Sequence, residues 1–285
     1  MGRIFLLILI LLTFHSNAQE VDIFETLNWD IDTGIYSLDS LNAVVSITDD
    51  ELLLRGSDTF EFMEFINGLG TPLDGIIYRI TGSEEGSYVT FRHEKLGYLK
   101  TDDWDQFVDS ESILSEVKEG TRIANQQRAE GFSNVYVDDW AEEPKFSATD
   151  DAAYWAIKGH DDDGFSFINA KAIKLSKDGY TEVLWIGDPS QFISAQSTLN
   201  PILGRLNYNE GFAYSDYVPG VDAVAAVGLG ALTYKLVTGK VGLAVSGGLF
   251  AALLVFAKKF AFLIFIPIIA GLSSIKNALF PKKIV

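Results

Sequence analysis

The C-terminal segment of the chain is apolar and bounded by lysines, and it restricts the possible folds more than any other feature. Residues 221–285 carry seven lysines and a single acid, Asp222, whereas residues 20–220 carry 38 acidic against 14 basic residues. The body therefore has a net charge of −24 and the tail one of +6. This division is typical of a water-exposed domain tethered to a bilayer, so the sequence predicts a membrane protein.

The N-terminus has the three parts of a secretory signal peptide. Arg3 supplies the positive charge, and residues 4–12 form an unbroken apolar run that is too short to cross about 30 Å of hydrocarbon. The tripeptide Ser16-Asn17-Ala18 then places small residues at both positions that determine cleavage. We therefore expect cleavage after Ala18 and export of the acidic body to the periplasmic or extracellular side.

Three apolar stretches of the tail compete for the bilayer, namely residues 221–236, 241–257 and 260–275. Each is close to the lower limit of about 17 residues for a spanning helix. Lys258 and Lys259 separate the second stretch from the third, because burying two ammonium groups in mid-bilayer would cost several kcal/mol. The sequence therefore predicts a membrane anchor with one to three hydrophobic helices.

The lysines of the tail indicate its orientation. From an exported domain, one crossing and three crossings both leave five lysines in the cytoplasm and two outside, whereas a two-crossing hairpin inverts this ratio. The positive-inside rule thus places the C-terminus in the cytoplasm without separating one crossing from three. The third stretch has no polar face with which to lie at an interface, which favours more than one crossing.

Small residues recur four positions apart in the tail, for example Gly247 with Ala251 and Gly248 with Ala252. Such spacing lets membrane helices approach closely, so it indicates self-association or packing within the tail. Membrane helices are also generally rich in glycine, and the sequence leaves both interpretations open.

The body alternates short β-rich runs with a few helical periods. Helical spacing predicts helices around residues 57–66, 109–131 and 188–199. The β-rich runs are residues 44–47, 51–55, 75–80, 87–92, 96–100, 134–140, 152–158, 165–175 and 180–186. Strands with separate helices and short turns indicate an α+β fold with a mostly antiparallel sheet and a few packed helices, followed by a C-terminal transmembrane helical tail.

These patterns divide the chain into four parts. They are a signal peptide (1–18), an N-terminal arm without a clear period (19–42), an acidic extracytoplasmic α+β domain (43–217) and a membrane anchor (218–285). The domain is long enough to close its own hydrophobic core. We therefore expect the fragment from Glu20 to Tyr217 to fold without the tail.

Several motifs follow one another along the body. In chain order they are Gly97-Tyr98-Leu99-Lys100, Asp102-Asp103, Ala124-Asn125, Arg128, Trp140-Ala141, Pro144, Trp155-Ala156, Asn169, Tyr214, Asp216, Val218-Pro219-Gly220 and Asp222. From Asn42 to about Lys240 the chain thereby resembles a family of bacterial membrane-anchored proteins grouped as a domain of unknown function. One departure is the strand after Asn169, where the family commonly carries leucine-glycine-arginine and this chain reads Ala172-Ile173-Lys174-Leu175. The resemblance implies a signal peptide, an exported domain and a C-terminal membrane segment, and it implies no established activity.

Six of these motif residues are candidates for a binding or structural role: Tyr98, Asn125, Arg128, Trp140, Trp155 and Asn169. The two tryptophans would suit the stacking of a ligand, but their position in β-rich runs favours core packing. Arg122 and Arg128 could bind an anion or a partner, although neighbouring glutamates make ion pairs within the helix the simpler interpretation.

The two histidines of the mature chain offer little chemistry. His93 stands beside Glu94 and suits a general base, but a solvent-exposed turn histidine is the favoured interpretation. Residues 160–164 contain three aspartates that suit calcium, yet their spacing lacks the alternate ligands of a calcium loop and fits a hairpin tip. We expect no metal and no cofactor.

Charge and motifs leave two classes of function. The acidic body disfavours nucleic acid, because it would repel phosphate, and the sequence has no nucleophile elbow, phosphate-binding glycine loop or metalloprotease motif. The first class is a non-enzymatic envelope module that binds or scaffolds a partner at the membrane. The alternative is a membrane-tethered enzyme that uses carboxylates. The lack of a nucleophile–base set favours the first, with the lipid bilayer and an envelope protein as partners.

Overall fold

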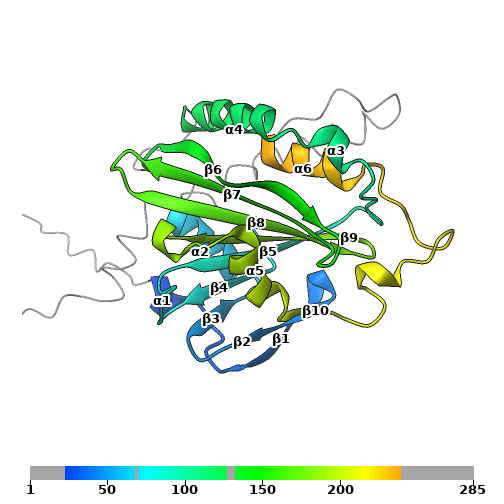
Figure 1. Ribbon diagram of the computed structural model, residues 1–285. Coiled ribbons are helices and arrows are strands. Elements are labelled where there is room, and N and C mark those ends of the chain that lie inside the picture. The colour runs from blue at the N-terminus through cyan, green and yellow to red at the C-terminus, as the bar shows by residue number, and fades with distance from the viewer. Residues whose placement is uncertain (1–22, 68–69, 127–131, 239–285) are drawn as a thin grey trace, which may run out of the picture.

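The computed structural model describes residues 23–67, 70–126 and 132–238 (Figure 1). Its helices are α1 (Ile23–Thr26), η1 (Asp39–Leu41), α2 (Asp58–Asn67), α3 (Trp104–Phe107), α4 (Ser110–Asn125), η2 (Pro189–Gln191), α5 (Ala195–Leu203), η3 (Tyr214–Asp216) and α6 (Leu229–Thr238). Its strands are β1 (Gly34–Leu38), β2 (Ala43–Ile47), β3 (Glu51–Leu54), β4 (Gly75–Arg79), β5 (Tyr88–Lys95), β6 (Val135–Ser147), β7 (Ala152–Asp161), β8 (Ser166–Ser176), β9 (Gly179–Gly187) and β10 (Leu206–Tyr208).

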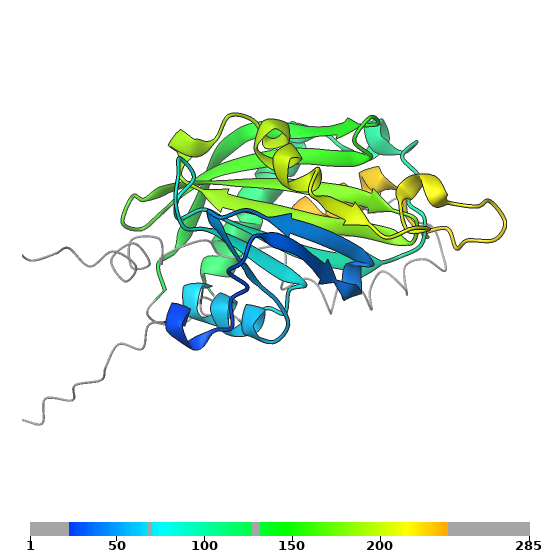
Figure 2. The same ribbon diagram turned by 90° about the horizontal axis from the view of Figure 1, so that it is seen from below.

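The strands form two antiparallel sheets. A seven-stranded sheet has the order β3-β4-β5-β9-β8-β7-β6, and a three-stranded sheet has the order β1-β2-β10 (Figure 2). Every paired strand in the described part of the chain is antiparallel to its neighbours. The expected α+β class with a mostly antiparallel sheet and a few packed helices is therefore confirmed.

None of the helices in the described ranges has both the length and the apolar character needed to cross a membrane. The apolar stretches 241–257 and 260–275 and the expected signal peptide lie outside the described residues.

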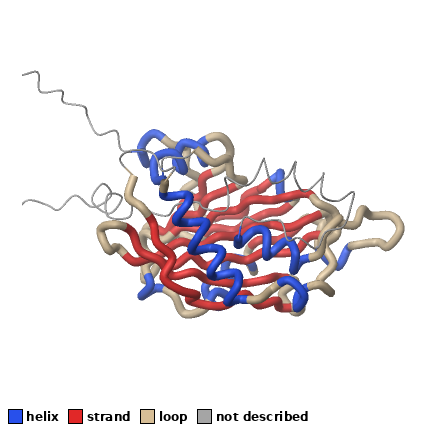
Figure 3. The backbone as a smooth tube through the Cα atoms, turned by 90° about the horizontal axis from the view of Figure 1, so that it is seen from above, coloured by secondary structure: helices blue, strands red, loops and turns tan. Residues whose placement is uncertain are grey.

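Side-chain alternation along β9 separates the two faces of the large sheet. Val183 and Trp185 point to the face that is covered by α5 and the small sheet. Tyr180 and Leu184 point to the opposite face, which is covered by helices. There α1 and α2 lie over the β3–β5 end, and α3, α4 and α6 lie over the β7–β8 side (Figure 3). Because both faces are covered, β9 is buried along its whole length.

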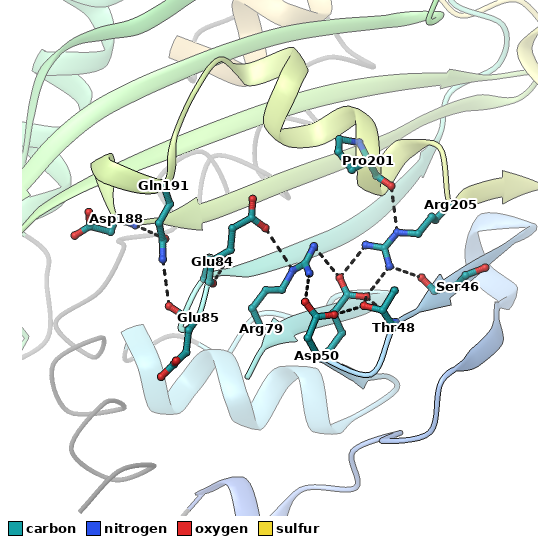
Figure 4. Close-up of polar contacts among 12 residues, drawn as sticks. Ser46, Thr48, Asp50, Arg79, Glu84, Glu85, Asp188, Gln191, Pro201 and Arg205 are labelled. Atoms are coloured by element: carbon teal, nitrogen blue, oxygen red, sulfur yellow. Dashed lines mark hydrogen bonds and ion pairs between the residues drawn. The ribbon is translucent and has the colours of Figure 1, made fainter. Parts of the chain in front are cut away.

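A buried carboxylate fastens the small sheet to the large one. The Glu51 side chain on β3 is fully buried, and the two Nη atoms of Arg205, just before β10, lie 2.6 and 2.8 Å from its oxygens. Arg79 on β4 reaches Glu51 at 3.2 Å and Asp50 at 2.7 Å (Figure 4). Burial alone would raise the pKa of Glu51, but hydrogen bonds from Arg205 and from the Thr48 N–H hold it below its ordinary value. We call this network the Glu51 clamp.

Several elements differ from the sequence-based expectation. Residues 34–38, part of the expected arm, form β1 and pair along their length with β2. The helix expected over 188–199 is two elements, because Asp188 caps the short η2 and Ser194 then caps α5. The β-rich run 96–100 is not a strand of either sheet, and its partner is found far along the chain.

Candidate functional site

The backbone of Gly97 and Tyr98 pairs with a segment that lies 126 residues downstream. The Tyr98 N–H donates to Ala223 O at 2.8 Å, and the Ala225 N–H donates to Tyr98 O at 2.9 Å. Gly97 has a φ of +91°, and a Cβ at this position would meet Ala223 O at 2.8 Å. This close approach of two backbones therefore requires glycine.

Three tyrosine rings stack beside this pairing. The Tyr98 ring lies between Tyr217, at a centroid distance of 3.8 Å, and Tyr214, at 4.5 Å. The Tyr214 hydroxyl donates to Leu99 O at 2.6 Å, and burial raises its pKa. The stack fixes the start of the segment that leads to α6.

The N-terminus of α6 is capped from the same motif. The Asp103 carboxylate accepts the N–H groups of Gly230 and Ala231 at 2.9 and 3.1 Å, and the Leu229 N–H donates to Lys100 O at 2.7 Å. These bonds satisfy donors that a helix start leaves free, and the negative charge suits the helix dipole. We call the contacts of residues 97–103 with residues 213–231 the C-terminal junction.

Helix α6 belongs to the core of the domain. Its apolar side chains Leu229, Leu232, Leu236 and Val237 are buried in one cluster with Ile113 of α4 and Trp155 of β7. Burial also lowers the pKa of Lys235 to about 8, an effect that the charge of Glu94 opposes. Here the structure differs from the sequence-based interpretation. Residues 229–238, which include the whole second half of the first candidate membrane stretch, form a helix packed on α3 and α4.

A row of charged side chains crosses the helix-covered face of the large sheet. Glu182 on β9 lies 2.9 Å from Lys171 Nζ on β8 and 3.2 Å from Arg92 Nη2 on β5. Glu94 lies 3.8 Å from Arg92. We call these four residues the charged row. Burial alone would raise the pKa of Glu182, but Lys171 and Arg92 hold it below its ordinary value, so the carboxylate stays ionised. The ionised carboxylate of Glu182 therefore neutralises the buried charges of Lys171 and Arg92. It carries no proton that it could donate at neutral pH.

Two candidate residues border the charged row. The Lys171 ammonium lies 5.9 Å from the centre of the Trp155 ring, which is itself buried in the cluster under α4 and α6. Asn169 precedes Lys171 on the same face of β8, and its Oδ1 is buried without a hydrogen-bond partner among the described residues. The expected core packing of Trp155 is confirmed.

Two other candidates hold the ends of α4. Asn125 at its C-terminus donates to Val135 O at 2.7 Å and accepts the Val135 N–H at 3.1 Å. The Trp140 indole donates to Ser110 O at the helix start, at 2.9 Å. Both residues thereby fix α4 on β6, and Arg128 lies outside the described residues. The five candidates that the structure describes do not meet at one point: Tyr98 is in the C-terminal junction, and the others are at α4 or beside the charged row.

His93 is not the exposed turn residue that the sequence favours. Its side chain is only 2% exposed, with Nδ1 3.2 Å from Thr181 Oγ1 and Nε2 3.6 Å from Asp178 Oδ1. Burial lowers its pKa, and Asp178 opposes that shift. Thr181 is completely buried and accepts a hydrogen bond from Tyr208 of β10 at 2.8 Å. This set therefore links the two sheets and presents no nucleophile to solvent.

The aspartates of residues 160–164 serve the turn between β7 and β8, as the hairpin interpretation predicts. Asp161 Oδ1 accepts the N–H groups of Asp163 and Phe165 at 3.0 and 2.8 Å, and Gly164 adopts a φ of +79°. In the ranges that the structure describes, no three His, Cys, Asp or Glu side chains are grouped to hold a metal ion.

Sequence reasoning named Glu94 only as a neighbour of His93 and did not single out the other three residues of the charged row, although a signal exists. Glu182 is the one charged residue in the run from Tyr180 to Ile186, which is mostly apolar and aromatic. A charge at an inward position of a strand that is buried on both faces must be compensated by neighbours. An isolated acid within such a run therefore indicates a buried polar site from the amino-acid sequence alone.

Comparison with known proteins gives a family and little else. A family model described as "Protein of unknown function (DUF2167)" matches residues 30–269. No curated protein matches the sequence. Among solved structures, the solution structure of cyanobacterial PsbP (CyanoP) from Synechocystis sp. PCC 6803 is similar with a TM-score of 0.39 and 8% identity, covering 63% of this chain and 94% of that chain. A likeness at this level does not transfer a function.

Proposed function

The chain belongs to DUF2167, a family of proteins of unknown function, and from that premise we propose that it is a membrane-tethered module that binds or scaffolds a cell-envelope partner on the non-cytoplasmic side. The body carries a net charge of −24 and the tail +6. An exported acidic domain with its lysine-rich end inside the cytoplasm accounts for this division under the positive-inside rule.

The observation that carries the proposal is the C-terminal junction. It fixes α6 into the core of the acidic domain, and the described part of α6 reaches Thr238, three residues before the uncharged stretch 241–257. A flexible linker would let the domain drift from the bilayer by tens of ångströms. A helix packed in the core leaves almost no slack between domain and membrane, so the module presents one defined surface to its partners.

Labelling of single cysteines tests the sidedness, because the natural sequence has no cysteine. Ser115→Cys lies on an exposed position of α4, and Val285→Cys lies at the C-terminus. A membrane-impermeant maleimide applied with the inner membrane intact should label Ser115→Cys, and it should label Val285→Cys only after permeabilisation. Labelling of both positions under the same condition would contradict the proposal, and the cysteine-free parent is the control for background.

The signal peptide is part of the same proposal. Mass spectrometry of the membrane-bound protein should find Gln19, or its cyclised form, as the first residue. A protein that retains Met1 would instead carry a permanent N-terminal apolar segment, and the orientation would need a different explanation.

A further inference from the structure

The two sheets have four outer edges, and three of them are protected. The β6 edge has three register irregularities along its pairing with β7, contains Pro144 and carries several charged side chains. The β3 edge is short, and the backbone of Asp30 pairs with Leu53 on its outer side at 2.8 and 3.0 Å. The β10 edge has only three residues. Proteins keep strand edges from pairing with other chains by means of bulges, proline residues, charged side chains, short strands and covering segments.

The fourth edge, β1, has little of this protection, and within the described ranges Arg55 covers it at the Ser37 carbonyl. Its five residues pair with β2 without an irregularity, and it contains no proline and no charged side chain. In the described part of the chain no strand lies along its outer side. An unprotected strand edge is a template for one more strand.

Backbone groups of β1 point outward at Ile35. On β2, the Ser46 N–H points toward β10, because it donates to Arg205 O at 3.3 Å. Hydrogen-bonding direction alternates along an antiparallel strand, so Ile35, which is opposite Ser46, directs its N–H and C=O away from β2. The same holds for Ser37, whose carbonyl accepts a hydrogen bond from Arg55 at 3.1 Å. Ile35 and Ser37 therefore both direct their backbone groups outward, and Arg55 already occupies the carbonyl of Ser37.

The side chains and charges around this edge indicate what would pair with it. Ile31 and Ile35 are 66% and 72% exposed, which is unusual for large aliphatic residues so close together. Asp32 and Asp39, one at each end of β1, are exposed. A second copy of this chain would bring the same two carboxylates, and a second acidic body, into contact. A basic segment would be attracted instead.

We propose that the outer edge of β1 is the docking edge for an extended, basic segment of a partner protein, which adds a strand to the small sheet. Its backbone would pair with Ile35, its aliphatic side chains would cover Ile31 and Ile35, and its cations would lie near Asp32 and Asp39. This inference rests on the proposed function and names the surface by which the module binds. Affinity from a strand this short is modest, as suits one contact of a scaffold.

A synthetic strand tests the proposal on the full-length protein in nanodiscs. The probe is a capped hexapeptide that alternates isoleucine or valine with lysine, and the control peptide has the same charge but prolines at two aliphatic positions. We expect the alternating peptide to bind and to slow hydrogen exchange at the Ile35 amide. Ile35→Pro removes the outward-facing N–H donor and part of the aliphatic side chain, and it leaves the β1–β2 hydrogen bonds in place because that N–H takes no part in them. Binding should fall by roughly tenfold, which is the loss of one hydrogen bond and part of one apolar contact.

Ile35→Lys is the second variant, because it keeps the strand and adds the charge that natural proteins use to protect an edge. Its binding should also fall by roughly tenfold, whereas Ile193→Ser, at an exposed isoleucine elsewhere on the surface, should bind like the parent. Equal affinity in all variants, equal binding of the proline control, protection mapped away from β1, or a dimer formed through β1 would each overturn the proposal. Maleimide labelling is independent of this result, so failure of the docking edge and failure of the membrane tether are distinguishable.

Discussion

The small sheet and the segment that ends in α6 are fastened to the same large sheet by different means. The small sheet is held by charge, through the Glu51 clamp, in addition to its apolar contacts. The C-terminal junction is held by backbone hydrogen bonds, a carboxylate cap, stacked tyrosines and the buried face of α6. The Glu51 clamp depends on the ionisation of the Glu51 carboxylate, and the C-terminal junction depends mainly on the shape of the backbone. They should therefore fail under different conditions.

The largest contrast in stability is expected when aspartate replaces an aliphatic residue in α6 and one in β1. Leu232→Asp places an unpaired carboxylate in the cluster under α4 and should lower the free energy of unfolding by about 4 kcal/mol. Ile35→Asp, at a mostly exposed position of β1, should change it by about 0.5 kcal/mol or less. Urea denaturation of both variants measures the difference. Equal losses would mean that α6 is not part of the core.

Removing the central charge of the Glu51 clamp should have the next largest effect. Glu51→Gln leaves the guanidinium groups of Arg205 and Arg79 without the buried carboxylate between them and should cost about 3 kcal/mol at pH 7. Because the pKa of Glu51 is lower in the folded protein than in the unfolded chain, its contribution is complete above about pH 4.5 and is lost as the pH falls further.

The stability difference between Glu51→Gln and the parent should accordingly shrink as the pH falls below about 4.5. Leu232→Ala is the control, because it removes apolar contacts in the core and introduces no group that titrates in this range. A difference that stays constant down to about pH 3 would show that the clamp is not electrostatic.

Backbone shape at the junction is tested by two glycines with similar torsion angles. Gly97→Ala introduces both a left-handed alanine and a contact of 2.8 Å with Ala223 O, and should cost about 2–3 kcal/mol. Gly56→Ala, at a φ of +68° with no heavy atom within 4 Å, introduces the torsional strain alone and should cost about 1 kcal/mol. Thermal unfolding of the pair separates strain from contact. Equal costs would remove the argument for close backbone approach at Gly97.

The cap of α6 should give the smallest measurable effect. Asp103→Ala removes the acceptor of two N–H groups and should cost about 1 kcal/mol. Asp102→Ala removes the neighbouring exposed carboxylate and should fall within about 0.5 kcal/mol of the parent. The two variants have the same composition, so any difference in unfolding temperature reports the cap. If Asp102→Ala is the more damaging variant, the assignment of the cap is wrong.

Local signals were sufficient for much of the fold. The helix expected over residues 109–131 is present as α4 through Asn125, begins after the Asp109 cap and buries Ile113, Val117 and Thr121 at helical spacing. The strands β2, β7, β8 and β9 lie where alternation or continuous apolar runs place them. These elements are recognisable because the pattern that defines each one is complete within a short window of residues.

The features that the sequence did not reveal depend on distant partners. Residues 96–100 are rich in apolar side chains because Leu99 enters the core and Tyr98 stacks on Tyr214 and Tyr217, and these partners are more than 100 residues away. Residues 229–238 are apolar because they pack on α3 and α4, and hydropathy alone cannot separate a buried helix of this length from part of a membrane span. His93 is buried because β9 and β10 meet over it.

The most direct test is whether α6 stabilises the domain. The sequence alone predicts that the fragment from Glu20 to Tyr217 folds by itself, whereas the structure adds four buried aliphatic side chains from α6, each worth about 1.5–3 kcal/mol when fully buried. Thermal unfolding of this fragment should be compared with that of the fragment from Glu20 to Thr238. We predict cooperative unfolding of the longer fragment and a much lower midpoint, or no cooperative transition, for the shorter one. Coincident transitions would contradict the placement of α6 in the core.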